Sequence, residues 1–307
     1  MTKVKLISIL ISTLFCLNTY SQNRFIIIDS TRICINTIGI ENRKAGQPVI
    51  VFQSGLGTPM GNWDKILKGV SDFAPLITYD RPGIGESEPD NELPTIKNVS
   101  DKLIKILNQL NLKPPYILVG HSLGGLYVRG FAVYHTELLA GLVIIDPADF
   151  TEDKITRRAY YEEIGLSKEK VDTIIRNIYY GPSNLKDPIS IRRESKILGD
   201  LRENDFKEIK QSPLPKSLPV HIITGGRFDL PERMRSKEYD EEAVFRIKMR
   251  IRVARGIDVI QSVDKGMLLY SGDAGHFVQI DDPELVISSI KIVLSDYEIT
   301  RLKDGKQ

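Results

Sequence analysis

Residues 116–135 read YILVGHSLGGLYVRGFAVYH and place one serine between an apolar run and a helical pattern. The run from Tyr116 to Val119 is continuously apolar, which is typical of a strand covered on both faces. Beyond Ser122, apolar side chains recur at helical spacings, at Leu126, Val128, Phe131 and Ala132. The serine therefore stands in a very short turn from strand to helix.

Glycines flank this serine at Gly120, Gly124 and Gly125. A turn this tight strains the serine backbone, and a Cβ atom two residues to either side would collide with it. The hydroxyl then projects from the sheet edge, and the N–H groups of the following helix favour negative charge there. The pattern is the G-x-S-x-G nucleophile elbow. The alternative is a glycine-rich turn that contains a serine by chance, so the rest of the chain must decide.

The first 21 residues differ from the rest of the chain. Lys3 and Lys5 precede an apolar run over 6–17, and the small residues Thr19 and Ser21 follow it. This pattern predicts a secretory signal peptide and hence an exported protein, periplasmic or extracellular. The run is short for a membrane span, so an uncleaved anchor is the alternative and no stable span is expected in the mature chain. Only one cysteine, Cys34, would then remain, which excludes an internal disulfide.

The remaining length suits one large domain with a sizeable core, and the formal charge of +2 gives no sign of nucleic-acid binding. Strand and helix patterns alternate along it, which predicts an α/β fold with a mostly parallel sheet flanked by helices. The expected strands are 25–28, 33–40, 48–53, 75–79, 116–119, 141–145, 220–224 and 267–270.

One segment interrupts the alternation. Residues 147–215 are densely charged, carry two Tyr-Tyr pairs and show helical spacing without a strand. We therefore expect a helical cap inserted at 147–215 into a core formed by 22–146 and 216–307. The arginine-rich stretch 243–254 fits a strand or a helix, and we favour a helix whose arginines form a solvated face.

A serine hydroxyl needs a base, and the base needs an orienting acid. Among the histidines beyond the leader, His276 stands in a loop directly after an apolar strand, at the sheet edge expected for Ser122. The others have structural settings: His121 adjoins the serine, His135 ends a helix and His221 lies inside a strand. His276 is therefore the predicted base.

Two aspartates are candidates for the acid, which should lie between the serine and the histidine in the chain. Asp229 follows the strand 220–224 in a glycine-containing loop, and Asp146 ends the strand 141–145. We favour Asp229. The oxyanion needs two backbone donors, and the N–H groups of Leu123 and Leu56 are the candidates, with Gly55 and Gly57 allowing close approach.

As a set, these motifs resemble the α/β-hydrolase family over nearly all of the chain beyond the leader. The resemblance implies an eight-stranded, mostly parallel sheet with a helical cap, Ser122 as nucleophile, His276 as base and a structural role for Asp80-Arg81. One departure is Ser54-Gly55, where the family usually has His-Gly. The motifs are Ser54-Gly55-Leu56-Gly57, Trp63, the stretch 79–87, Gly120-His121-Ser122-Leu123-Gly124-Gly125 and Gly275-His276-Phe277.

These observations predict a cofactor-free serine hydrolase without a metal, acting on a small-molecule acyl substrate through an acyl-enzyme. An ester or related carboxylic-acid bond is the expected target. One alternative is an acyltransferase that uses the same triad. Another is a binding protein that keeps the fold without turnover.

Overall fold

The computed structural model describes residues 23–180 and 184–304, so the predicted signal peptide at 1–21 lies outside the described residues. The centre of the molecule is one eight-stranded sheet in the order β1-β2-β4-β3-β5-β6-β7-β8. The strands are β1 (Arg24–Ile28), β2 (Thr31–Ile38), β3 (Val49–Gln53), β4 (Leu76–Tyr79), β5 (Tyr116–His121), β6 (Leu139–Ile145), β7 (Val220–Gly225) and β8 (Gly266–Ser271). All eight predicted strands are present.

The sheet is mostly parallel, as expected. Strand β2 is antiparallel to both of its neighbours, β1 and β4. The strands from β3 to β8 are parallel to one another. The register pairs Gln53 with Gly120, and His121 with Ile145. The carboxyl ends of β3, β5 and β6 therefore meet at one edge, which is where open α/β sheets form their sites.

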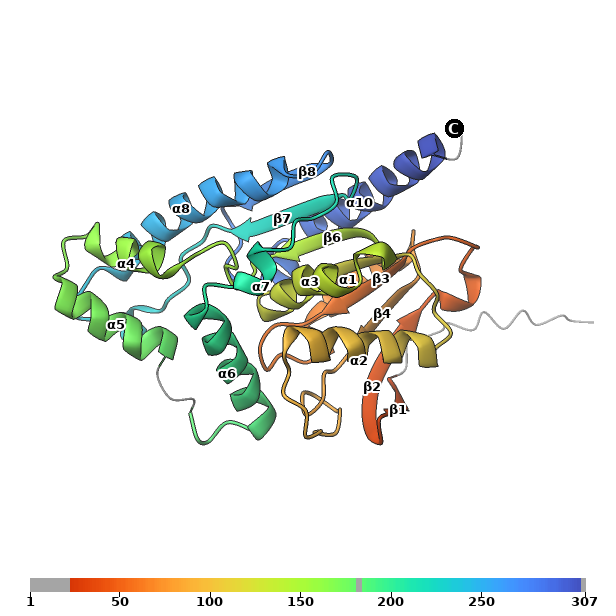
Figure 1. The fold of residues 1–307 in the computed structure, drawn as a ribbon, viewed down its shortest axis with the longest axis horizontal. Helices are drawn as coiled ribbons and strands as arrows, with labels where there is room; N and C mark the ends of the chain where they lie inside the picture. Colours follow the sequence, from red (N-terminus) through yellow and green to blue (C-terminus); the bar gives the residue numbers. More distant parts are fainter. Residues whose placement is uncertain (1–22, 181–183, 305–307) are drawn as a thin grey trace, which may run out of the picture.

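Helices cover both faces of this sheet (Figure 1). One face is packed by α2 and α3 and by the C-terminal part of α8, and the other by α1 and α10. The apolar periodicity explains this cover, because each of these helices turns its buried stripe toward strands that are apolar on both faces. The helices are α1 (Asp64–Ser71), α2 (Ile96–Gln109), α3 (Leu123–Tyr134), α4 (Lys154–Glu162), α5 (Lys168–Tyr180), α6 (Ile189–Glu203), α7 (Lys207–Lys210), α8 (Glu241–Gln261), α9 (Val278–Asp281) and α10 (Pro283–Asp304). Short 3₁₀ turns span Ile40–Asn42, Met60–Trp63, Thr136–Leu138 and Glu232–Met234.

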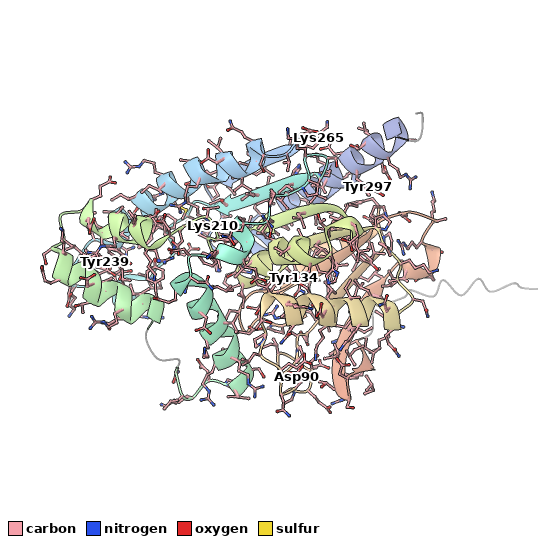
Figure 2. All side chains as sticks on the ribbon, in the orientation of Figure 1. Asp90, Tyr134, Lys210, Tyr239, Lys265 and Tyr297 are labelled. Carbon is pink, nitrogen blue, oxygen red and sulfur yellow. The ribbon has the colours of Figure 1, made fainter. Side chains whose placement is uncertain are left out.

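Residues 147–215, which we call the cap segment, run from the end of β6 to just before β7 and contain α4 to α7 without a strand among their described residues. Figure 1 shows α4, α5 and α6 extending away from the sheet. Helices α4 and α5 share a small apolar cluster with Val244 of α8. Tyr239 joins this end of the molecule (Figure 2), where its ring meets that of Tyr161 edge to face at 5.6 Å.

The stretch 243–254 is helical and lies within α8, as favoured from its sequence. Asp240 caps the helix by accepting a hydrogen bond from the Ala243 N–H at 3.0 Å. No helix in the described part of the chain combines the length and the apolar character that crossing a membrane requires.

Candidate active site

Ser122 occupies the predicted turn, between the last residue of β5 and the first residue of α3. Its backbone is left-handed and strained, with φ 54° and ψ −117°. Two close backbone approaches hold the turn: a Cβ atom on Gly124 would lie 2.0 Å from the Gln53 carbonyl oxygen, and one on Gly120 would lie 2.3 Å from the Gly124 carbonyl oxygen. Only glycine fits at these two positions, so the sequence pattern is a packing requirement of the turn.

His276 lies in the loop between β8 and α9, and its imidazole is half exposed. Its Nδ1 lies 2.5 Å from Oδ2 of Asp146, the residue that follows β6. An ionised carboxylate only accepts hydrogen bonds, so Nδ1 carries the proton and Nε2 keeps a free lone pair. No hydrogen bond joins Ser122 to His276 among the described residues, and such bonds are often long before substrate binds.

Two hydrogen bonds and one ion pair hold the Asp146 carboxylate. Besides His276, Arg252 of α8 lies 3.0 Å from Oδ1, and the Gly225 N–H donates to Oδ1 at 3.3 Å. Burial alone would raise the pKa of Asp146, but Arg252 and His276 hold that pKa below its ordinary value. Asp146 is therefore an ionised and fixed partner of the imidazole.

The preference for Asp229 as the partner of His276 is not met in the structure. The Asp229 carboxylate lies against Gly275, the residue before His276. It is half exposed, however, and is paired with Arg227 at 2.6 Å. Asp146, which directly follows β6, is buried, and its Oδ2 lies 2.5 Å from the imidazole Nδ1. The alternative aspartate of the sequence analysis is thus the one in contact.

His121 contacts the loop that carries His276. Its Nε2 lies 2.8 Å from the backbone carbonyl oxygen of His276, and the two rings lie 4.6 Å apart between centroids. Burial, together with the neighbouring His276, lowers the pKa of His121 to about 3, so this ring is neutral at ordinary pH. A carbonyl only accepts, so His121 Nε2 donates to it. The remaining histidines are apart from the site: His135 lies 3.4 Å from Asp101, and buried His221 lies 2.8 Å from Ser289 Oγ.

The loop Ser54-Gly55-Leu56-Gly57, which we call the oxyanion loop, follows β3 and lies beside the elbow. A Cβ atom on Gly55 would come 3.3 Å from the Ser122 Cβ atom. Among the described residues, the N–H groups of Leu56 and Leu123 donate no hydrogen bond to the protein. Both predicted donors are therefore available to an oxygen atom bound at the serine.

Asp80 and Arg81 brace this region, as the family resemblance implied. Asp80 accepts hydrogen bonds from the N–H groups of Met60 at 2.7 Å and Glu86 at 2.9 Å. Arg81 is buried and donates to the Ser54 carbonyl at 2.6 Å and to the Gly55 carbonyl at 2.7 Å. Its Nε donates to Glu194 of α6 at 2.6 Å.

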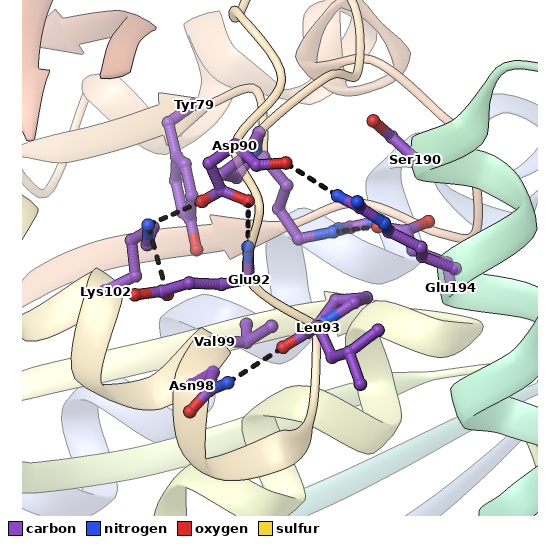
Figure 3. A pocket seen from close by; sticks show the side chains of 13 residues that line it. Tyr79, Asp90, Glu92, Leu93, Asn98, Val99, Lys102, Ser190 and Glu194 are labelled. Carbon is purple, nitrogen blue, oxygen red and sulfur yellow. Dashed lines mark hydrogen bonds and ion pairs between the residues drawn. The ribbon is translucent and has the colours of Figure 1, made fainter. Parts of the chain in front are cut away.

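A pocket adjoins this ion pair, between α2, α6 and the loop after β4. Ser190 and Glu194 enter it from α6 opposite Asp90 (Figure 3). Lys102 is buried here and forms ion pairs with Asp90 at 2.6 Å and Glu92 at 3.2 Å. The charged groups of this pocket are largely paired with each other, and neither Ser122 nor His276 lines it.

Sequence reasoning missed three contacts in or near the site. The arginines of 243–254 were expected to face solvent, but Arg252 turns inward to Asp146, and Arg255 just beyond that stretch pairs with Asp149. Glu194 gave no sequence signal, because it reaches the oxyanion loop from 137 residues further along the chain. Within the described residues, no group of His, Cys, Asp and Glu side chains has the arrangement of a metal site.

Comparison with known proteins agrees with this fold. Residues 48–165 match the family model described as alpha/beta hydrolase fold. The chain is 29% identical over 242 residues to 3-oxoadipate enol-lactonase 1 of Acinetobacter baylyi, covering 75% of this chain and 90% of that protein. It is 26% identical over 310 residues to the probable transporter efuK of Hormonema carpetanum, covering 92% of this chain but 44% of that protein. The chain spans less than half the length of the first curated relatives it matches.

A solved structure shows the same fold. The enol-lactonase from Burkholderia xenovorans LB400 superposes with a TM-score of 0.54, at 17% identity, over 89% of this chain and all of that one.

Proposed function

This chain has the α/β-hydrolase fold and its residues 48–165 match the family of that name, and we propose that it is a serine hydrolase acting through an acyl-enzyme on Ser122. One observation carries the proposal: a strained serine at the start of α3 shares a sheet edge with an imidazole that an ionised aspartate holds at 2.5 Å. A turn with a purely structural role does not require a strained serine beside an imidazole that is bonded to a carboxylate.

The proposed reaction begins at Ser122. Its Oγ attacks the carbonyl carbon of the substrate, and the hydroxyl proton passes to Nε2 of His276. The C=O π electrons move to oxygen, and the N–H groups of Leu56 and Leu123 donate to that oxyanion. Asp146 stabilises the imidazolium through Nδ1, in the role first assigned to Asp229.

The intermediate then collapses. The bond from carbon to the leaving oxygen breaks, and the proton on Nε2 goes to that oxygen. Water attacks the acyl-serine in the same way, giving its proton to His276, and the Ser122 Oγ leaves and recovers that proton. No cofactor is needed to balance these steps.

The proposed substrates are small molecules with an ester or a related carboxylic-acid bond. Relatives named enol-lactonase and putative carbamate hydrolase support this class, since a lactone is a cyclic ester and a carbamate, an amide derivative of carbonic acid, is also attacked at a carbonyl carbon. The abundance of charged residues in the cap segment argues against long-chain lipids. We also propose that the chain acts outside the cytoplasm, on the strength of the leader pattern at 1–21.

The test uses a fluorophosphonate probe and short p-nitrophenyl esters. We expect the protein to become labelled and to hydrolyse the esters, and Ser122→Ala to lose both while keeping its circular-dichroism spectrum. Unchanged turnover in a folded Ser122→Ala variant would refute the proposal. Transfer of the acyl group to an added alcohol in preference to water would instead favour the acyltransferase alternative.

A further inference from the structure

One acidic residue of the cap segment, Glu194 of α6, forms a hydrogen bond with the oxyanion loop. The two carboxylate oxygens of Glu194 have different partners: Oε1 accepts from Arg81 Nε at 2.6 Å, and Oε2 accepts from the Gly57 N–H at 2.8 Å. The side chains of Arg81 and Glu194 are 4% and 3% exposed, so water does not compete for these bonds. Burial alone would lower the pKa of Arg81, but Glu194 raises it, so the guanidinium keeps its charge.

These contacts fix both peptide planes that meet at Leu56. The Leu56 N–H belongs to the same peptide group as the Gly55 carbonyl, which accepts from Arg81 Nη2 at 2.7 Å and from the Thr58 N–H at 3.2 Å. In a trans peptide the C=O and N–H point in opposite directions, so holding the carbonyl toward Arg81 aims the Leu56 N–H away from it. The next peptide group carries the Gly57 N–H, which Glu194 holds.

The guanidinium also strengthens the donor. A cation bound to the Gly55 carbonyl polarises that peptide group, which makes its N–H more positive. Glu194 in turn fixes the guanidinium by accepting a hydrogen bond from its Nε–H. Nη1 and Nη2 therefore remain directed at the Ser54 and Gly55 carbonyls.

Packing places Glu194 where this role requires it. Ile191, one turn earlier on the same face of α6, lies against Gly57, where a Cβ atom would come 3.1 Å from its Cδ1. Ser190 lies against Gly83 in the turn after Arg81. Helix α6 therefore packs on both segments that Glu194 connects.

We propose that Glu194 is a positioning residue that orients the Leu56 N–H for oxyanion binding, so that the oxyanion hole is complete only when the cap segment is docked. This inference rests on the proposed hydrolase function. Glu194 does not touch the substrate: it acts through Arg81 and Gly57.

The main test compares Glu194→Leu, the double variant Arg81→Met/Glu194→Leu, and Asp200→Asn as a control. Asp200 lies on the same helix in an exposed pair with Lys196. The single variant leaves a buried arginine without its partner and is expected to lose stability. The double variant replaces a buried ion pair by apolar side chains of similar volume, a change that is often neutral for stability.

We expect the folded double variant to lose about 10²-fold in kcat on p-nitrophenyl acetate with KM changed less than threefold, because removing an oxyanion donor costs on the order of 10²–10³ in kcat. The Ki of phenylboronic acid, which forms a tetrahedral adduct on serine, should rise by the same factor as kcat/KM falls. A purely structural role would not link these two quantities. A double variant with the kcat and Ki of Asp200→Asn would overturn the inference, and if it does not fold, Glu194→Gln decides by the same measurements.

Amide hydrogen exchange separates this inference from the proposed function. The Gly57 N–H should exchange more slowly in the original protein than in any folded variant without Glu194, whether or not the protein hydrolyses esters. A protein that neither hydrolyses esters nor reacts with fluorophosphonate, but shows this difference, would refute the function and support the loop contact. Equal Gly57 exchange in an active protein would refute the role of Glu194 alone.

Discussion

Replacing each of the two aspartates by asparagine discriminates sharply between them. Asp146→Asn removes the acceptor that keeps the proton on His276 Nδ1, and an asparagine amide can present a donor there and favour the wrong tautomer. We expect kcat to fall on the order of 10⁴-fold, which is about 5.4 kcal/mol of transition-state stabilisation. Asp229→Asn changes an exposed pair with Arg227 and should leave kcat within about threefold, since such pairs contribute little.

Stability complicates the first variant and must be measured with it. Asp146→Asn leaves Arg252, whose side chain is 10% exposed, without its carboxylate, at a cost of about 3–5 kcal/mol in the free energy of unfolding. Asp146→Asn/Arg252→Met removes that unpaired charge, and Arg252→Met alone serves as its control.

The assay is p-nitrophenyl acetate hydrolysis at a temperature where urea denaturation shows each variant to be folded. The reasoning predicts that both Asp146 variants are nearly inactive and that Arg252→Met keeps most of its activity. An inactive Asp229→Asn beside a folded, active Asp146→Asn would refute it and return the role to Asp229.

Two further predictions concern protons. Because His276 must be neutral to accept the serine proton, kcat/KM should rise with pH across the acidic-to-neutral range. The low pKa of Asp146 keeps its carboxylate ionised throughout this range, and a profile flat from about pH 5 to 9 would contradict a histidine base. Burial lowers the pKa of His221 to about 4, so the unfolded chain binds more protons between about pH 4 and 6.5, and stability should fall as the pH drops through this window. His221→Asn, which can keep the bond to Ser289, should reduce that slope by up to about 1.4 kcal/mol per pH unit in denaturation series; an unchanged slope would show that His221 is not its source.

Much of the fold was predictable because its signals are local. The strands of the sheet are short apolar runs bounded by turn residues. The serine turn is recognisable from its glycines, which are required because a Cβ atom at these positions would clash with the backbone. The apolar spacing of 243–254 fits a strand as well as a helix, and a helix was favoured because a lone strand there would have an unprotected edge. The inward direction of Arg252 could not be predicted, because it depends on a carboxylate far away in the chain.

The acid was harder to predict for a physical reason. Asp146 and Asp229 follow adjacent strands, so the sequence places both near His276 and leaves the choice to side-chain direction. Asp146 has a left-handed backbone, with φ 36°, and is buried under the loop, whereas Asp229 is drawn away by Arg227 at a spacing of two residues. Nothing local to Asp146 distinguishes an aspartate that braces a turn from one that is the hydrogen-bond partner of the imidazole.

The bond between Glu194 and the Gly57 N–H has a consequence for exchanging parts between relatives. The elbow is fixed by backbone contacts among β3, β5 and α3, so it should survive recombination of the surrounding segments. The oxyanion loop is fixed partly from outside the core, by a side chain of the cap segment. A chimera that carries a foreign cap segment would therefore inherit the nucleophile intact but not the geometry of the Leu56 N–H, unless the donor supplies a carboxylate at the position of Glu194. Substrate range and catalytic rate would then change together in such chimeras.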